Sequence, residues 1–586
     1  MPKTLQSPSF ILFLLLSSAC APSDPGQPLH SLFEREWSLR LQENPLLATS
    51  VGVHRYNDRL PSMGLSDLQR RAESAQSFLE ELERIDPKLL NPRDRVSYAM
   101  FREQMESRIR SFEFREFQLP INADSGFHSH IARLPNEVPL RDPQDYQNYL
   151  ERLREVPRYF EEFTRLMRQG MQEGRTLPAV VTEGIEATIS SHVTDNPQES
   201  VFFAPFENFP AAVSSSERER LRKEGAAAIL DSVVPSYGMF AEFIEREYIP
   251  ACRESLGASE LPDGPDYYRW LIGQHTTLEL SADQIHQVGL REVERIRSEM
   301  EAIVSEVGFE GDFRQFLDYL RTDPQFIPET PEGLLMRAAW IAKEMDGKLP
   351  ALFQTLPRLP YTVEAVPDHL APKYTTGRYV PAPVGGTRPG IYWVNTYNLP
   401  SRTLYTLPAL TLHEAVPGHH LQYALLHELE KLPDFRRFSS VTAFGEGWGL
   451  YAEFLGIEAG IYKTPYENFG RLTYEMWRAC RLVVDTGIHT LGWTRSQAVD
   501  YLASNTALSL HECTTETDRY ISWPGQALAY KLGELKIREL RRKAEKALGP
   551  NFDVRKFHDA VLLNGPVSLS VLQDLIDTFI QEQAGS

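Results

Sequence analysis

The chain has 586 residues, of which 42% are hydrophobic, so it is long enough to bury more than one sizeable core. It carries 80 acidic and 61 basic residues, a formal net charge of −19 at pH 7, and it has no basic run. This balance argues against nucleic acid and against a polybasic membrane surface as partners. The four cysteines, none in C-x-x-C spacing, are too few for a disulfide framework or a cysteine metal site.

The N-terminus has the pattern of an export signal. Lys3 is followed by an apolar run over 10–16 that is too short to span a bilayer, which predicts a signal peptide over 1–20. The stretch S-S-A-C ending at Cys20 resembles a bacterial lipobox, which predicts lipidation of Cys20 and a Pro-, Ser- and Gly-containing tether over 21–27. The protein would then be anchored in the bacterial cell envelope, facing the periplasm or on the outer membrane. Ordinary cleavage would instead release it into the periplasm or the medium.

The body of the chain is predicted to be mainly helical. Periodic apolar residues predict helices over 66–85, 281–307 and 528–548, the first two opened by Ser-x-x-Gln capping boxes at Ser66 and Ser281. Short strands are predicted near 361–366 and 390–396. The turn residues at 262–265 mark the predicted boundary between an N-terminal helical lobe, 28–262, and a second region, 263–586.

A stretched zinc-peptidase signature, H-E-A-V-P-G-H-H-L-Q, occupies 413–422. The standard H-E-x-x-H helix holds two imidazoles one turn apart, with the Glu between them as general base. Here His413 and His419 are six positions apart, which on an ideal helix is about 9 Å of rise and roughly 240° of rotation. The two rings would diverge, so an unbroken helix cannot make this site.

The residues between the two histidines provide an interruption. Pro417 has no N–H to give the carbonyl of His413, and Gly418 tolerates unusual backbone angles. Two residues looped out of the helix would return His419 to the position of the second ligand. His420, seven positions after His413 and on the same helix face, is the competing ligand. The plainer interpretation is a Pro-Gly turn beside ordinary surface histidines.

A third ligand is available 33 residues after His413, in the segment F-G-E-G-W-G-L-Y-A-E at 444–453. A catalytic zinc takes three protein ligands and keeps one position open, and two His with one Glu is a recurring set. Glu446 is therefore the predicted third ligand, although a lone Glu on such a helix is usually a solvated charge. Glu453, seven residues later on the same face, suits a carboxylate that orients a ligand imidazole. Glycines alternate here with large side chains, which indicates a helix packed closely on a neighbour.

These motifs resemble those of known peptidases. The segment 418–423 is similar to the G-H-x-x-x-[YH] end of the zinc helix in angiotensin-converting enzyme and thimet oligopeptidase, and Glu446 with Glu453 resembles the E-x6-E helix of the latter. Arg519-Tyr520 looks like the R-Y of angiotensin-converting enzyme, whose Tyr hydroxyl supports the transition-state oxyanion. The combination of H-E-x-x-P-G-H-H, E-G-W-x-L-Y-A-E and R-Y-x-x-x-P-G-Q-A resembles most the bacterial "domain of unknown function 885" family, placed in the Glu-zincin clan.

The resemblance implies a fold and an activity. The fold is a mainly α-helical, two-lobed Glu-zincin-like architecture with a small β-sheet beside the active-site cleft, where the strand over 390–396 would pair with substrate. The activity is hydrolysis of short peptides with one Zn²⁺ per chain on His413, His419 and Glu446. Carboxypeptidase or dipeptidyl carboxypeptidase action follows from the likeness to angiotensin-converting enzyme.

The residue types assign the remaining roles. Glu414 would take a proton from a metal-activated water and pass it to the leaving amine. The oxyanion would be stabilised by Tyr520, and His489 is a second catalytic candidate, with Tyr530 as a further donor. His489 shares a helix face with Arg481 and Asp485, so a structural charge cluster is the alternative. Arg519 is the candidate for binding a substrate carboxylate.

A function from another class is also open. The chain could be a noncatalytic peptide-binding or scaffold lipoprotein of the cell envelope with a degenerate metal site. Glu414 argues against this, because a purely structural zinc needs no general base beside its ligands.

Overall fold

The computed structural model describes residues 25–368, 370–383 and 388–585. The predicted signal peptide, Cys20 and residues 21–24 of the tether lie outside the described residues. Within the described ranges the protein is mainly helical and has one three-stranded sheet, so the predicted fold class is confirmed.

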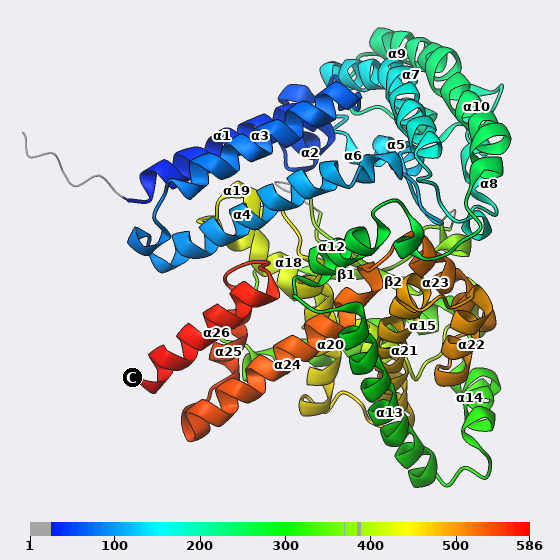
Figure 1. Ribbon diagram of the computed structural model, residues 1–586. Coiled ribbons are helices and arrows are strands. Elements are labelled where there is room, and N and C mark those ends of the chain that lie inside the picture. The colour runs from blue at the N-terminus through cyan, green and yellow to red at the C-terminus, as the bar shows by residue number, and fades with distance from the viewer. Residues whose placement is uncertain (1–24, 369, 384–387, 586) are drawn as a thin grey trace, which may run out of the picture.

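The N-terminal helices run along one side of the molecule, drawn from blue to green in Figure 1. They include α1 (Gln27–Glu43), α2 (Pro45–Ser50), α3 (Leu65–Glu83), α4 (Pro92–Glu113), α5 (Phe127–Ala132), α7 (Pro143–Gln172), α9 (Ser215–Ala228) and α10 (Val234–Phe243). The predicted capping box of α3 is wrong. The helix already begins at Leu65 after Gly64, so Ser66 is inside it and the Gln69 side chain contacts Glu73 instead.

One helical run, Ser215–Ala251, is long and apolar enough to cross a membrane by length and composition alone. It consists of α9 and α10 joined and extended by short π-helical turns. Several of its large side chains, among them Ile229, Tyr237 and Phe240, are buried in the same core as α7, whereas Leu230 and Met239 are exposed. One face of the run therefore packs in the core of the folded body.

The C-terminal helices surround the metal-ligand candidates. They include α12 (Gly264–Thr276), α13 (Ala282–Glu306), α14 (Phe313–Thr322), α15 (Pro331–Asp346), α17 (Leu407–Glu414), α18 (His419–Glu428), α20 (Thr442–Glu458), α21 (Pro465–Thr490), α22 (Arg495–Asn505), α23 (Leu510–Ser522), α24 (Ala529–Leu548), α25 (Val554–Leu562) and α26 (Leu569–Ala584). The predicted Ser281–Gln284 capping box of α13 is confirmed. Helix α13 packs along α21, and α20 packs along α24.

Two large hydrophobic cores hold these helices together. The first joins α7 and α10 to α13, α14 and α21, and the second joins α1, α3 and α4 to α17, α20, α24 and α26. Each core thus contains residues from both sides of the turn at 262–265. The turn itself is present, since Asp263 has φ of +57° and α12 begins at Gly264. The predicted division into regions 28–262 and 263–586 is not a division of the core, because side chains distant in sequence pack together.

The sheet has the order β1-β3-β2, with β1 (Tyr361–Ala365) parallel to β3 (Gly390–Val394) and β2 (Gly377–Val380) antiparallel to it. The two predicted strands are β1 and β3. The prediction that the strand over 390–396 pairs with substrate is wrong, because β3 is central and both of its edges are occupied. The unpredicted β2 is an edge strand of only four residues.

Helices α20 and α24 approach closely at glycines. A Cβ on Gly533 of α24 would lie 2.0 Å from the carbonyl oxygen of Ala443 and 2.9 Å from the Cα of Gly447, both in α20. No side chain fits between the two backbones, so this contact fixes the distance between the helices. The close packing on a neighbouring helix that the glycines at 444–453 predict is confirmed at Gly447.

We expect Gly533→Ala to lower the free energy of unfolding by about 1–3 kcal/mol, because the two helices must separate to admit the methyl group. Gly445→Ala is the matched control, since the nearest atoms to its Cβ are 3.8 Å away in Gln422. That change should be neutral or slightly stabilising in a helix. Urea denaturation of both variants measures the difference, and equal stabilities would contradict the close contact.

Candidate metal centre

The stretched motif folds as two helices rather than one bulged helix. Helix α17 ends at Glu414, α18 begins at His419, and a turn over 415–418 with a cis Val416–Pro417 peptide joins them. A Cβ at position 418 would lie 1.9 Å from the carbonyl oxygen of His413, so only glycine fits this turn. The indole Nε1 of Trp448 in α20 donates a hydrogen bond of 2.8 Å to the carbonyl oxygen of Pro417. The turn is thereby attached to the helix that carries the third candidate ligand.

The turn brings the three predicted ligands together. Nε2 of His413 and Nε2 of His419 each lie 3.6 Å from Oε2 of Glu446, and the ligand atoms of all three residues fall within 4.8 Å of one another. The two imidazole rings are nearly perpendicular, at 87°, with centroids 4.7 Å apart. His413 is buried, whereas the side chains of His419 and Glu446 are 14% and 25% exposed. These three residues could hold a metal ion.

Glu453 orients the first ligand, as the sequence predicts. Its Oε1 lies 2.8 Å from Nδ1 of His413, and both side chains are buried. Because Glu453 accepts a hydrogen bond from Nδ1–H, the lone pair on Nε2 of His413 is free to face a metal ion beside Glu446. The ring is also fixed by packing, because a Cβ on Gly449 would lie 2.5 Å from it.

The electrostatics of the group favour a cation. Burial alone would lower the pKa of His413, but the nearby Glu446 carboxylate and the hydrogen bond to Glu453 outweigh it and raise that pKa to about 9. Burial opposes ionisation of Glu446, yet the two histidines hold the pKa of its carboxyl well below the usual range. With Glu414 close by, three carboxylates surround two imidazoles, and this excess of negative charge suits a divalent metal ion.

The competing ligand His420 points away from the group. Its Nδ1 lies 3.0 Å from the Tyr379 hydroxyl, and its ring packs 4.5 Å from that of Tyr361, between centroids. Burial lowers the pKa of His420 to about 4. His419, and not His420, is therefore the histidine that stands with His413 and Glu446 in the candidate donor group. The interpretation as ordinary surface histidines is wrong, because His413 and His420 are 3% and 2% exposed.

Glu414 lies beside the group at the last residue of α17. Its Oε2 accepts a hydrogen bond of 2.7 Å from the backbone N–H of Tyr379 in β2. The side chain is partly exposed, and its hydrogen bond is to Tyr379 and not to either histidine. The edge strand thus holds the predicted general base in place without covering it.

His489 and Tyr520 have other partners. Nδ1 of His489 accepts from the backbone N–H of Ala258, and its Nε2 donates to the carbonyl oxygen of Tyr520, both at 3.0 Å. Burial lowers the pKa of His489 to about 3. No ring nitrogen is left for an oxyanion, so the structural alternative fits His489 better than the catalytic one.

The hydroxyl of Tyr520 is equally engaged. It accepts from Trp477 Nε1 at 3.0 Å and Arg481 Nε at 2.9 Å, and it donates to Glu516 at 2.7 Å. Arg519 is paired as well, with Nη1 on Glu516 at 3.2 Å and Nη2 on Gln526. The Tyr520 hydroxyl has no position left for an oxyanion in this arrangement, which argues against its predicted role, whereas Arg519 keeps further N–H groups.

Tyr423 is a site residue that the sequence prediction missed. It lies one helical turn after His419, with ring centroids 6.3 Å apart, and it is half-buried. Burial and the nearby charges of Glu446 and Glu414 raise the pKa of Tyr423. Among the described residues its hydroxyl has no hydrogen-bond partner. The signal was present in the sequence, as the fourth residue after His419 on the same helix face.

Comparisons with known proteins place the fold. A family model described as "Bacterial protein of unknown function (DUF885)" matches residues 45–576. The crystal structure of a candidate lipoprotein from Colwellia psychrerythraea is similar at a TM-score of 0.90 and 28% identity, covering 95% of this chain and 100% of that one. A candidate lipoprotein of unknown function from Shewanella oneidensis shares the fold at a TM-score of 0.72 and 17% identity, over 93% of this chain and 98% of that one. No curated protein matches the chain significantly.

Proposed function

The chain belongs to the DUF885 family of bacterial proteins, and we propose that it is a zinc-dependent peptidase that hydrolyses short peptides. The observation that carries this proposal is the pairing of a two-histidine, one-glutamate donor group with a separate, partly exposed carboxylate, Glu414. A structural metal site needs the donors but not the extra carboxylate. The noncatalytic alternative leaves Glu414 without a purpose.

Zinc suits the donor set better than Mg²⁺ or Ca²⁺ does. Two imidazole nitrogens and one carboxylate form a recurring catalytic zinc set, whereas Mg²⁺ and Ca²⁺ prefer oxygen ligands throughout. His413, His419 and Glu446 would hold the ion, with Glu453 fixing the tautomer of His413. A bound zinc ion supplies Lewis acidity, which lowers the pKa of water and polarises a peptide carbonyl.

Glu414 would carry the proton through the reaction. Its Oε2 is held by the Tyr379 amide, so Oε1 is the oxygen available to a water molecule. The carboxylate accepts a proton as the water oxygen forms a bond to the scissile carbonyl carbon. It then gives that proton to the amine nitrogen as the C–N bond breaks. The donor for the tetrahedral oxyanion would be Tyr423, whose hydroxyl is free, rather than Tyr520.

The substrate end and the cellular location are finer parts of the proposal. Carboxypeptidase or dipeptidyl carboxypeptidase action stays a weaker part of the proposal, because Arg519, the candidate for a substrate carboxylate, already contacts Glu516 and Gln526. A location in the cell envelope agrees with the relatives described as candidate lipoproteins. Lipidation of Cys20 stays a prediction from the sequence, with ordinary export as its alternative.

We expect one zinc ion per chain, lost in a His413→Ala variant because a third of the donor set and its contact with Glu453 disappear. His420→Ala is the matched control, since it changes the neighbouring buried histidine outside the donor group. Elemental analysis of dialysed protein measures the metal content. Equal zinc content in the two variants would contradict the ligand assignment.

We expect Glu414→Gln to keep the zinc and to lower kcat for peptide hydrolysis by about 10²–10⁴-fold, because the amide cannot take the proton from water. Mass spectrometry of a mixed peptide library treated with each protein measures the loss and reports which bonds are cut. Chelation of the metal from the unaltered protein should abolish the same cleavages. Unchanged turnover in the variant would remove Glu414 from the mechanism.

We expect Tyr423→Phe to lower kcat by about 10²-fold with little change in KM, because the hydroxyl acts on charge that develops in the transition state. Tyr530→Phe provides the comparison, since Tyr530 lies on α24 and its ring is covered by Arg481, whose Cζ lies 4.4 Å from the centroid. Steady-state kinetics on one library-derived peptide measures both. A larger loss in Tyr530→Phe would transfer the donor role to that residue.

A further inference from the structure

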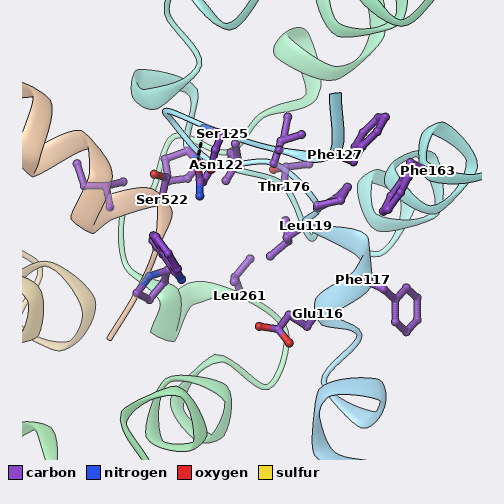
Figure 2. A pocket seen from close by; sticks show the side chains of 18 of the residues that line it. Glu116, Phe117, Leu119, Asn122, Ser125, Phe127, Phe163, Thr176, Leu261 and Ser522 are labelled. Carbon is purple, nitrogen blue, oxygen red and sulfur yellow. Dashed lines mark hydrogen bonds between the residues drawn. The ribbon is translucent and has the colours of Figure 1, made fainter. Parts of the chain in front are cut away.

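Two cavities between the N-terminal helices and α12 and α23 share part of their walls. One has a volume of about 530 Å³ and the other about 1130 Å³. We call the residues that line both of them the neck; they are Ser111, Glu116, Phe117, His130, Tyr159, Phe163 and Trp523. Figure 2 shows the smaller cavity, with Glu116 and Leu261 on one side and Ser522 and Asn122 on another. The neck is the wall that the two cavities share.

Glu116 is the acidic residue of this space that lacks a cationic partner. The other acidic residues on the walls are each matched by arginine, namely Glu36 with Arg40 and Arg108, Glu43 with Arg70 and Arg71, and Glu137 with Arg133. Glu116 accepts a hydrogen bond of 2.6 Å from Ser111, and among the described residues no basic group lies within 4.0 Å of it. Its carboxylate extends into the cavity in Figure 2. A carboxylate placed in this way lacks a counterion.

Aromatic rings make up most of the rest of the neck. Tyr159 and Phe163 of α7 meet edge to face with centroids 5.0 Å apart, and Trp523 at the end of α23 is 40% exposed. The ring of Phe117 points away from the Glu116 carboxylate in Figure 2 and packs on Phe112, with centroids 5.6 Å apart. Ring faces attract organic cations, and the attraction grows where water is partly excluded. The three other rings and one unpaired carboxylate are the elements of a cation-binding site.

The space offers much less to an anion. The one arginine on the wall of the smaller cavity, Arg253, directs its guanidinium to the backbone carbonyl oxygens of Thr176, Ser255 and Gly257. The arginines of the larger cavity are paired with the carboxylates named above. The unsatisfied charge on these walls is negative.

The neck is connected to the metal-ligand group through neighbouring side chains. Cζ of Arg519 lies 5.9 Å from the centroid of the Trp523 ring, and Arg519 interacts in turn with Tyr530 of α24. Tyr530 lies one helical turn before Gly533. Gly533 packs on Gly447, which is the next residue after Glu446. A chain of contacts therefore runs from the neck to the third metal ligand.

We propose that the neck binds the cationic group of a peptide, an ammonium or a guanidinium, with Glu116 as its counterion and the aromatic rings around it. The peptide nature of the ligand rests on the proposed function. The binding step itself needs no hydrolysis, so it is tested separately. The cation comes either from the free amino terminus of the peptide or from a lysine or arginine side chain.

The test uses the intact zinc-loaded protein carrying Glu414→Gln, so that peptides are bound without being consumed. Three hexapeptides of alternating Ala and Leu, all amidated at the carboxyl end, are titrated by calorimetry. The first has a free amino terminus, the second is N-acetylated and uncharged, and the third is N-acetylated with one inner Leu replaced by Lys. We expect at least one cationic peptide to bind about tenfold more tightly than the uncharged one. Which of the two does so identifies the source of the cation.

Adding Glu116→Gln should remove this preference and leave binding of the uncharged peptide unchanged, because glutamine still accepts the Ser111 hydrogen bond but carries no charge. Glu137→Gln is the matched control, since Glu137 lines the larger cavity and is paired with Arg133. Equal binding of all three peptides, no binding of any, or a preference that survives Glu116→Gln overturns the proposal. Cleavage assays of the protein with Glu414 intact report independently on the proposed peptidase activity.

Discussion

The candidate metal centre depends on one interruption of the backbone. If α17 continued through residue 418, His413 and His419 would point in different directions, and the third ligand would have no partner. The turn over 415–418 is possible because Gly418 has no side chain to strike the carbonyl of His413, and because Trp448 binds the carbonyl of Pro417. Trp448 lies two residues after Glu446 on α20. One helix therefore supplies both the third ligand and the anchor of the turn that positions the other two.

The packing around α20 extends this control to the whole group. Gly449 leaves room for the ring of His413, Glu453 accepts a hydrogen bond from its Nδ1–H, and Gly447 lets the backbones of α20 and α24 come into contact. These contacts are short and involve buried atoms, so small displacements of α20 would alter the donor geometry. On the open side, β2 holds Glu414 through a single backbone amide. The ligands are thus fixed by a rigid core, while the proposed base is held at a strand edge that a substrate could approach.

The proposed peptidase activity and the proposed cation-binding neck would act on different parts of one peptide. The metal-ligand group would perform hydrolysis, and the neck would hold a charged part of the peptide some distance away. Glu116 keeps its negative charge uncompensated in a space where neighbouring carboxylates are matched by arginine. Binding energy gained there can hold a peptide in place for the reaction without taking part in the chemistry.

The sequence by itself determined the mainly helical class. It also predicted an export signal and proposed His413, Glu414, Glu446 and Glu453 as members of one site, because these follow from residue types at fixed local spacings. It left His419 and His420 open, since a choice between adjacent residues depends on how the turn rotates the helix after it. It also assigned catalytic roles to His489 and Tyr520, whose polar atoms are already hydrogen-bonded to neighbouring groups. Only the tertiary structure decided these points. It also showed that β3 is the central strand, that the Tyr423 hydroxyl has no hydrogen-bond partner among the described residues, and that Glu116 has no basic partner there. Each of these features depends on contacts between residues far apart in the chain. The local sequence pattern does not indicate which polar side chains will find hydrogen-bond or ion-pair partners in those contacts.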